Sequence, residues 1–122
     1  MEKHLLLLID DNALLTGLYK AALEKEGYLV VFAHDGASGI ALAREKKPDG
    51  IILDLLMPGM DGFEVLKELK KDDATKDIKT IVLTTLVKPE ELERAKQLGA
   101  VECIVKSEAR LADIVARVHA LF

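Results

Sequence analysis

The chain has 122 residues, enough for one domain with an ordinary hydrophobic core, so neither a disulfide nor a structural metal is needed to hold a fold. Its formal charge of −4 and its lack of a dense Lys/Arg tract argue against direct binding of nucleic acid. The apolar run at residues 5–9 is far shorter than the roughly 20 residues of a membrane span, and the single cysteine, Cys103, cannot form an internal disulfide, so we expect a cytoplasmic protein outside the membrane.

Short apolar runs alternate five times with segments of helical periodicity, a pattern typical of strand–helix units around a parallel sheet. We expect strands at about residues 4–9, 28–32, 50–53, 79–84 and 102–105. Helices are expected to begin at about Asn12, Gly36, Gly62, Pro89 and Ser107. Gly27 and Gly99 suit the ends of the first and fourth helices, and the second must end before Pro48. The pattern predicts a single α/β domain over residues 1–122.

The spacing of apolar residues predicts which face of each helix packs on the sheet. The first helix should bury Leu14, Leu15, Leu18, Tyr19, Ala22 and Leu23. The later helices should bury, in chain order, Ile40 and Ala41; Phe63, Leu66 and Leu69; Leu92, Ala95 and Leu98; and Leu111, Ile114, Val115, Val118 and Leu121. Ser107 should cap the last helix, and the charged stretch at residues 70–73 should line solvent.

Polar side chains stand where the expected strands end. In an open parallel sheet covered by helices on both faces, ligands bind beyond the carboxyl ends of the strands, near the point where the strand order reverses. The residues at these ends are Asp10, Asp11, Asp54, Thr84 and Lys106. Right-handed crossovers would place the first and third strands side by side, so we expect the three carboxylates to meet.

Three neighbouring carboxylates repel one another unless a cation joins them, and Mg²⁺ is the natural candidate because it is a hard ion that prefers oxygen ligands. An aspartate can also act as a nucleophile on phosphorus and form an aspartyl phosphate. Mg²⁺, the Lys106 ammonium and the Thr84 hydroxyl would then offset charge on the phosphoryl oxygens. The strand ends therefore predict a Mg²⁺-dependent phosphoryl-transfer site at Asp54.

Each residue has a simpler interpretation when it is taken alone. Asp11 could cap the first helix, Lys106 could be a surface lysine whose stem covers apolar neighbours, and Thr84 could be an ordinary β-branched strand residue. We prefer the functional interpretation because all of these residues occupy the same kind of position, a strand end, on four different strands.

Four segments carry a resemblance to a known family. They are Leu-Ile-Asp-Asp-Asn at 8–12, Asp-Leu-Leu-Met-Pro-Gly-Met-Asp-Gly at 54–62, Leu-Thr-Thr at 83–85 and Val-Lys at 105–106. From end to end the chain resembles the receiver domain of two-component response regulators, in particular a stand-alone, chemotaxis-regulator-like receiver. The resemblance implies a flavodoxin-like three-layer sandwich in which five helices cover a five-stranded parallel sheet of order 2-1-3-4-5.

The resemblance also implies a function. Asp54 would accept a phosphoryl group from a phosphohistidine on a partner histidine kinase or histidine phosphotransfer protein. Asp11, Asp54 and the backbone carbonyl of Leu56 would hold Mg²⁺, with Asp10 acting mostly through water. Thr84 would then move inward, and the surface of the fourth helix, fifth strand and fifth helix would change to favour a downstream protein or a homodimer. A gain of about −1.5 to −2 charges is ample for such a switch.

Two departures from the family pattern lie near the fifth strand. Ser107 stands where members usually have proline, so we expect a trans Lys106–Ser107 bond, because a cis bond before a non-proline residue costs about 3–4 kcal/mol. Cys103 stands where members often have an aromatic ring, which excludes aromatic switching at this site.

A third departure concerns the lifetime of the phosphorylated form. Leu56 and Leu86 would flank the phosphoryl group where members often place polar side chains that help water attack, and Thr85 is larger than the usual residue. We therefore expect slow self-dephosphorylation. The three histidines, His4, His34 and His119, are scattered along the chain, and we expect no catalytic or metal-binding role for them.

Other functions fit the sequence less well. A metal-dependent phosphatase with an aspartate nucleophile needs a second carboxylate two residues later as general acid, and Leu56 cannot serve. A nucleotide hydrolase would need a Gly-rich phosphate loop ending in Lys-Ser/Thr, which the sequence lacks. A degenerate receiver that binds partners without phosphorylation is disfavoured by the intact acidic, threonine and lysine set. A domain cut from a longer regulator remains an open alternative.

Overall fold

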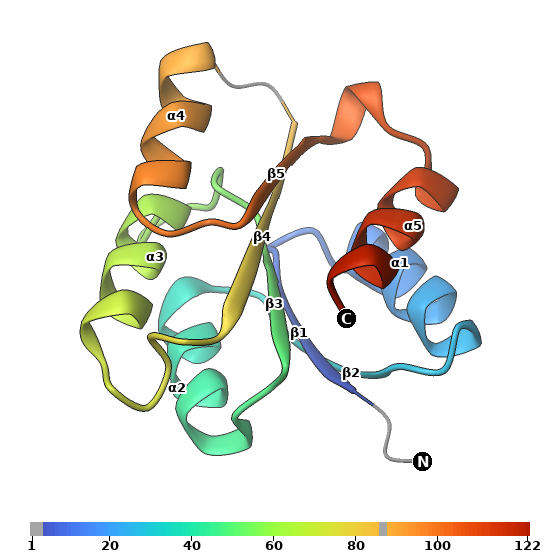
Figure 1. The fold of residues 1–122 in the computed structure, drawn as a ribbon, viewed down its shortest axis with the longest axis horizontal. Helices are drawn as coiled ribbons and strands as arrows, with labels where there is room; N and C mark the ends of the chain where they lie inside the picture. The colour runs from blue at the N-terminus through green and yellow to red at the C-terminus, as the bar shows by residue number, and fades with distance from the viewer. Residues whose placement is uncertain (1–3, 86–87) are drawn as a thin grey trace.

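The computed structural model describes residues 4–85 and 88–122 and contains one five-stranded parallel sheet covered by helices on both faces (Figure 1). The strands are β1 Leu5–Ile9, β2 Leu29–Ala33, β3 Gly50–Leu53, β4 Lys79–Thr84 and β5 Glu102–Val105, in the order β2-β1-β3-β4-β5. The helices are α1 Ala13–Lys25, α2 Gly36–Lys46, α3 Gly62–Lys71, α4 Pro89–Gln97 and α5 Leu111–Leu121, with a short 3₁₀ helix at Lys106–Glu108. The predicted fold class and strand order are confirmed.

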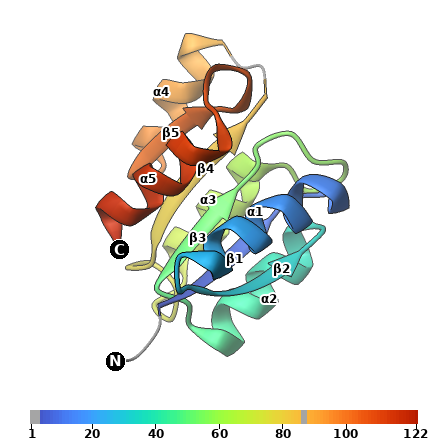
Figure 2. The same cartoon turned by 90° about the vertical axis from the view of Figure 1, so that its right-hand side faces the viewer.

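The hydrophobic core has two parts, one on each face of the sheet. Along β1, Leu7 and Ile9 face the part covered by α2, α3 and α4, whereas Leu6 and Leu8 face the part covered by α1 and α5. Figures 1 and 2 show these two groups of helices on opposite sides of the sheet. All four side chains are at most 2% exposed, as expected for a central strand of a parallel sheet, whose residues are buried on both faces.

The first three helices each have a side-chain cap at the N-terminal end. Asn12, Asp35 and Asp61 each accept a hydrogen bond from the backbone N–H three residues later, which satisfies one of the free donors of a helix start. Because each capping residue follows a strand or a strand-end loop, these caps fix where the chain leaves the carboxyl edge of the sheet.

The predicted buried faces of the first two helices are partly wrong. Leu14 and Leu18 are 76% and 51% exposed, and α1 instead buries Thr16 together with Tyr19 and Leu23. The apolar stripe on α1 is wider than the contact area, so the sequence pattern alone does not show which of its edges meets the sheet. In α2 the residue that packs inward with Ile40 is Ala43, while Ala41 is exposed.

The predicted start of the last helix is also wrong. Ser107 lies in the 3₁₀ helix, and α5 begins at Leu111 after the N-cap Arg110, whose N–H donates to Asp113 Oδ2 at 3.0 Å. Leu111 is 40% exposed, whereas the predicted core residues Ile114 and Val118 are buried. No cis peptide bond occurs in residues 4–85 and 88–122, so the predicted trans Lys106–Ser107 bond is confirmed.

The charged stretch at residues 70–73 does more than line solvent. The Lys70 Nζ donates to the carbonyls of Lys76 and Ile78, both at 3.1 Å, and its stem covers Gly99 after α4. Asp72 pairs with Arg44 of α2 and caps the turn at Ala74. Within the described part of the chain, no helix is long and apolar enough to span a membrane.

Candidate functional site

The predicted site residues meet at the carboxyl edge of the sheet. Asp10 and Asp11 follow β1, Asp54 follows β3, Thr84 ends β4, and Lys106 follows β5. The backbone continues the sheet beyond the strands, because the Asp10 N–H donates to Ala33 O at 3.1 Å and the Asp54 N–H donates to Ile9 O at 2.9 Å. The first bond ties Asp10 to the end of β2, and the second holds the Asp54 backbone beside the end of β1, next to Asp10.

The three aspartates form one carboxylate cluster. Each offers an oxygen, and these oxygens all lie within 4.8 Å of one another. Asp10 and Asp54 are 6% and 5% exposed, whereas Asp11 is exposed. The helix-cap interpretation of Asp11 is wrong, because Asn12 Oδ1 accepts the Leu15 N–H and caps α1. The Asp11 carboxylate is therefore not used as the cap of α1.

Backbone N–H groups fix the orientation of the two buried carboxylates. Asp10 Oδ1 accepts the N–H of Asn12 at 2.9 Å, and Asp54 Oδ1 accepts the N–H of Leu56 at 3.1 Å. In both residues the other oxygen, Oδ2, is the one nearer to Lys106. The local turns after β1 and β3 therefore aim both carboxylates at one point.

Lys106 neutralises part of this negative charge. Its Nζ lies 2.8 Å from Asp10 Oδ2 and 3.5 Å from Asp54 Oδ2, and its side chain is 9% exposed, so the interpretation as a surface lysine is wrong. Burial lowers the pKa of the ammonium, but the hydrogen bond to Asp10 and the charge of Asp54 outweigh burial and raise the pKa above its usual value. Lys106 is therefore a buried cation at neutral pH.

Asp54 is held in an unfavourable ionised state. Burial raises the pKa of its carboxyl group, and the Leu56 N–H and the Lys106 ammonium oppose this only in part. The Thr84 hydroxyl also acts to lower this pKa, although its fully buried Oγ1 makes no hydrogen bond of ordinary geometry to any residue in the described ranges. A buried hydroxyl is usually hydrogen-bonded, so that of Thr84 is suited to donate to a group bound at the site.

This electrostatic balance predicts that Asp54→Asn makes the Mg²⁺-free protein more stable at neutral pH. The raised pKa means that the folded protein binds a proton at Asp54 more readily than the unfolded chain does. Ionisation of Asp54 therefore lowers the free energy of unfolding by its full amount at pH values above the raised pKa of the folded protein. This loss disappears at pH values below 3.8, the pKa of the group in the unfolded chain. Lys106 keeps its closer partner, Asp10, in the variant.

Urea unfolding of both proteins from neutral pH down toward pH 4 in chelator-treated buffer measures this effect. The stability advantage of Asp54→Asn should shrink as the pH falls. Asp73→Asn, which changes a 93% exposed carboxylate, is the matched control and should have little effect. A variant less stable than the wild type at neutral pH would contradict the prediction.

The donor set fits Mg²⁺. Three carboxylates from the ends of β1 and β3 converge, no histidine or cysteine of the described ranges joins the group, and a hard divalent cation prefers oxygen ligands. The carbonyl of Leu56 accepts no hydrogen bond from the residues that the structure describes, so it is available as a further oxygen ligand. Asp10, Asp11, Asp54 and the Leu56 carbonyl are thus the groups that could hold the ion.

The residues predicted to tune dephosphorylation are only partly placed. Leu56 is 48% exposed directly after the Asp54 turn, and Thr85 is exposed after β4. Leu86 lies outside the described residues. Cys103 is half-buried on β5, its Sγ lies 3.9 Å from Leu92 O, and burial raises the pKa of the thiol.

The histidines lie apart from the carboxylate cluster. His119 Nδ1 is 2.8 Å from the Tyr28 hydroxyl, His4 Nδ1 is 3.5 Å from Asp49 Oδ2, and His34 stacks on Phe32. These contacts are structural links among β1, β2, α5 and the loops beside them.

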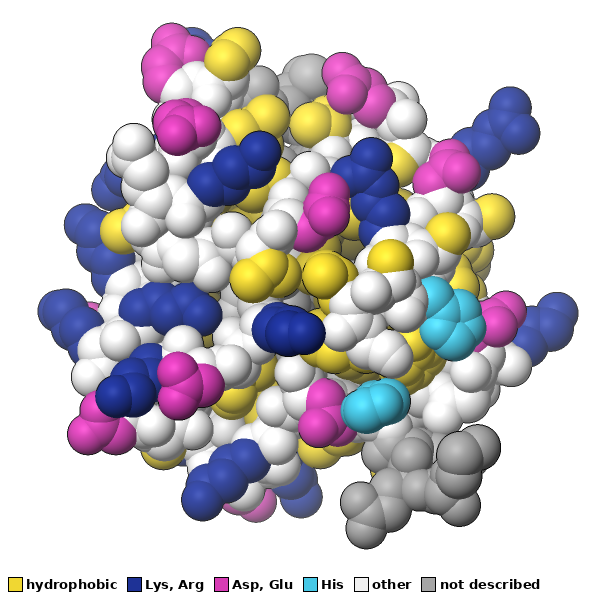
Figure 3. Space-filling view, in the orientation of Figure 1, with side chains coloured by type: hydrophobic (Ala, Val, Ile, Leu, Met, Phe, Trp, Pro, Cys, Tyr) yellow, Lys and Arg dark blue, Asp and Glu magenta, His cyan; other side chains and the backbone are white. Residues whose placement is uncertain are grey.

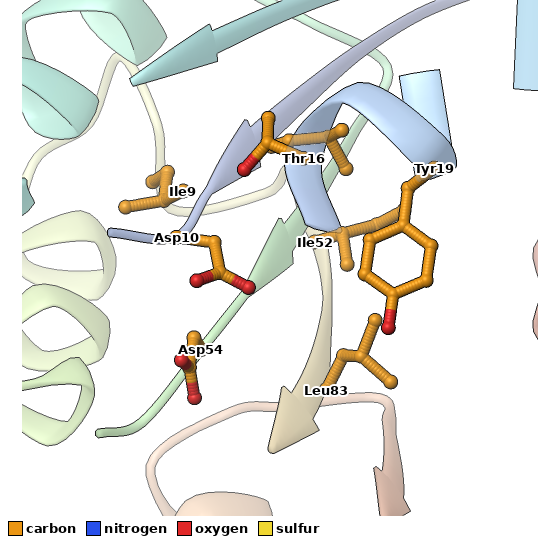
Figure 4. Close-up of a pocket in the computed structure, with 8 residues that line it drawn as sticks. Ile9, Asp10, Thr16, Tyr19, Ile52, Asp54 and Leu83 are labelled. Atoms are coloured by element: carbon orange, nitrogen blue, oxygen red, sulfur yellow. The ribbon is translucent and has the colours of Figure 1, made fainter. Parts of the chain in front are cut away.

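Sequence reasoning missed two residues that shape the site. Tyr19 was predicted only as a core residue, but it lines a small cavity beside Asp10 and Asp54 (Figure 4). Gly62 was predicted only as a helix start, but a Cβ there would lie 2.6 Å from the backbone oxygen of Asp54. No local sequence signal identifies either role, because both depend on which elements meet.

Comparison with known proteins agrees with this geometry. The profile of the response regulator receiver domain matches residues 6–119. The chain belongs to this family. Receiver domains are signal-transduction modules of two-component systems, they bind Mg²⁺ through acidic residues, and they interact with histidine kinases or phosphotransfer proteins and with downstream targets.

Similar receiver proteins differ in length. Protein PilH of Pseudomonas aeruginosa is 39% identical over 103 residues, which cover 83% of this chain and 84% of PilH. The DNA-binding dual master transcriptional regulator RpaA of Synechocystis is 38% identical over 116 residues; these cover 95% of this chain and 48% of RpaA, so the chain spans about half of that relative. The structure of chemotaxis protein CheY4 of Vibrio cholerae covers 99% of this chain with a TM-score of 0.91 at 28% identity.

Proposed function

We propose that this receiver domain accepts a phosphoryl group on Asp54 from a phosphohistidine of a histidine kinase or histidine phosphotransfer protein, in a Mg²⁺-dependent reaction. The observation that carries the proposal is the pairing of Lys106 with both Asp10 and Asp54 beside the Thr84 hydroxyl, which has no ordinary hydrogen bond within the described residues. Outside a phosphoryl-transfer site, a buried lysine, two buried carboxylates and a spare hydroxyl at one sheet edge would be a costly arrangement.

The proposed roles follow from the atoms present. A carboxylate oxygen of Asp54 attacks phosphorus, the P–O bond forms as the P–N bond breaks, and the imidazole nitrogen of the donor keeps the bonding electron pair. Lys106 pairs with a phosphoryl oxygen, and the Thr84 hydroxyl donates to another. Asp11, Asp54 and the Leu56 carbonyl, with Asp10 through water, would hold Mg²⁺, which supplies positive charge that offsets the phosphoryl oxygens.

The proposed output is a change in the surface formed by α4, β5 and α5 that favours a downstream protein or a homodimer. α4 buries only Ala95, so few contacts oppose its movement. Cys103 on β5 has no aromatic ring to rotate, so the change would travel through the backbone from Thr84. In Figure 3, Lys and Arg side chains are interspersed with Asp and Glu on this face, which supports protein partners rather than direct nucleic-acid binding.

We further propose that the chain works as a single receiver domain in the cytoplasm. Its one cysteine, Cys103, is a free thiol, which suits a reducing compartment. A metal-dependent phosphatase remains the weaker alternative, since Leu56 stands where such an enzyme needs its general acid. Accordingly, we expect the chain to catalyse only its own phosphorylation and dephosphorylation.

Phosphorylation of Asp54 is tested with a small acyl phosphate and Mg²⁺, followed by intact mass. We expect a mass gain of one phosphoryl group on the wild type and none on Asp54→Ala, because Asp54 is the proposed nucleophile and Lys106 binds the other buried carboxylate, Asp10, more closely, at 2.8 Å against 3.5 Å. Asp73→Ala is the matched control and should be modified like the wild type, since its carboxylate is exposed and distant from the cluster. An equal adduct on Asp54→Ala would overturn the proposal.

The phosphorylated form is expected to persist for minutes or longer, because the apolar side chain of Leu56 offers no hydrogen bond to an attacking water. Leu56→Gln should shorten this lifetime several-fold by supplying such a partner. Loss of the phosphorylated mass with time, after removal of the acyl phosphate, gives the rate. Leu18→Gln is the control, because Leu18 is 51% exposed, close to the 48% of Leu56, but lies on α1. A wild-type lifetime of seconds would refute the prediction.

A further inference from the structure

Tyr19 carries a hydroxyl that the proposed chemistry does not use. The residue is 8% exposed, and its ring packs in the part of the core between the sheet and the pair α1 and α5. The other tyrosine in this part of the core, Tyr28, bonds through its hydroxyl to His119 at 2.8 Å. The Tyr19 hydroxyl makes no hydrogen bond to any residue in ranges 4–85 and 88–122. Tyrosine hydroxyls at the edge of a core normally have a hydrogen-bond partner, so this one is available to a small polar group beside it.

A small cavity beside the Tyr19 side chain offers space for that group. Its volume is about 10 Å³, close to that of one water molecule measured in the same way. Its polar lining residues are Asp10, Thr16, Tyr19 and Asp54, and four apolar residues of β1, β3 and β4 close the rest. Figure 4 shows Asp10 and Asp54 on one side of this cavity and the Tyr19 ring on the other. A polar cavity of this size suits one ordered water with two to four partners.

The available donors and acceptors determine how a water would bind. The Thr16 hydroxyl already donates to Asn12 O at 2.8 Å, so among the polar side chains of the lining only Tyr19 has a free donor. Asp10 and Asp54 are acceptors, and each carboxylate has lone pairs beyond those used by Asn12, Leu56 and Lys106. Burial raises the pKa of Tyr19, and the charges of Lys106, Asp10 and Asp54 also act on it, so the phenol keeps its proton and lies within reach of their field.

We propose that Tyr19 is a positioning residue of the phosphoryl-transfer site: its hydroxyl donates to one buried water, and that water donates to the carboxylates of Asp10 and Asp54. The water then has three hydrogen bonds, the usual number for a buried water. It would hydrogen-bond to both carboxylates while Lys106 holds their Oδ2 atoms. The inference rests on the proposed phosphorylation of Asp54. It adds that Tyr19, through the water, helps to set the orientation of the Asp54 carboxylate.

The test compares Tyr19→Phe with Tyr28→Phe. Each removes one tyrosine hydroxyl from the same part of the core and keeps the ring, but of the two only Tyr19 lines the cavity. Phosphorylation rates are measured against acyl phosphate concentration at saturating Mg²⁺. We expect Tyr19→Phe to lower the maximal rate constant about tenfold, with little change in the half-saturating concentration, because loss of a bonded water leaves the carboxylates less well oriented. Tyr28→Phe should keep the wild-type rate constant, because Tyr28 bonds to His119 and does not line the cavity.

Three outcomes separate the two claims. A wild type that takes no phosphoryl group would overturn the proposed function itself. A phosphorylated wild type with equal maximal rate constants in Tyr19→Phe and Tyr28→Phe would overturn only the role of Tyr19. A crystal structure of the wild type at a resolution that orders buried water decides the mechanism: a water bonded to the Tyr19 hydroxyl supports it, and a dry cavity overturns it.

Discussion

Lys106→Met is expected to lower the free energy of unfolding by about 3 kcal/mol in Mg²⁺-free buffer, because it removes the cation that pairs with two buried carboxylates. The Nζ of Lys106 lies 2.8 Å from Asp10 and 3.5 Å from Asp54, both of which are buried. Methionine fills similar space, so the loss is mainly electrostatic. The same change should slow phosphorylation by an acyl phosphate about a hundredfold, since a preorganised positive charge is lost from the phosphoryl site.

Adding Mg²⁺ shows whether Lys106→Met destabilises the protein through the lost positive charge or through lost packing. The ion carries the positive charge that the variant lacks, so it should raise the Tm of Lys106→Met more than that of the wild type. Lys71→Met is the matched control, because Lys71 is 73% exposed and its pairing with Glu68, across one helical turn, is a surface contact. Equal Mg²⁺ shifts in the variant and the wild type would show that Lys106 does not neutralise the carboxylates that bind the metal.

The five predicted site residues were found from the sequence because their positions follow from one geometric rule. Each stands at the carboxyl end of a strand, and parallel strands place those ends at the same edge. The strand ends were clear because buried parallel strands are continuous apolar runs, such as Leu5–Ile9 before Asp10. The charge pairing of Lys106 with Asp10 and Asp54 does not follow from the strand order, because β4 lies between β5 and β3 and the lysine side chain must reach past its end.

The wrong predictions share a different cause. Leu14 and Leu18 are exposed although they continue the apolar pattern of α1, and Ser107 does not cap α5 although it is a good capping residue. In both cases local propensity allows more than one buried face or helix start. Which one forms depends on how each helix packs against the sheet and on how α1 packs against α5. The cavity beside Tyr19 is of the same kind, because it arises between residues of α1 and of three strands.

Gly62 illustrates a site residue whose importance comes from space alone. It is the first residue of α3, and its N–H donates to Leu55 O at 3.0 Å, which brings the helix against the loop after Asp54. A Cβ on Gly62 would lie 2.5 Å from Leu55 Cα and 2.6 Å from Asp54 O. Both atoms belong to the backbone and cannot turn aside, so either α3 or the Asp54 loop must move.

Gly62→Ala is therefore expected to lower the free energy of unfolding by about 2 kcal/mol, the scale of overpacking in a tight site, and to reduce both Mg²⁺ affinity and the rate of phosphorylation. Gly17→Ala in α1 is the matched control: beyond the helix's own backbone and adjacent residues, no atom of the described residues lies within 4 Å of the added Cβ, so it should raise stability by about 0.5–1 kcal/mol. Chemical unfolding, Mg²⁺ titration and intact mass after acyl phosphate treatment measure the three effects. If Gly62→Ala matched Gly17→Ala in all three, the contact of α3 with the Asp54 loop would not control the site.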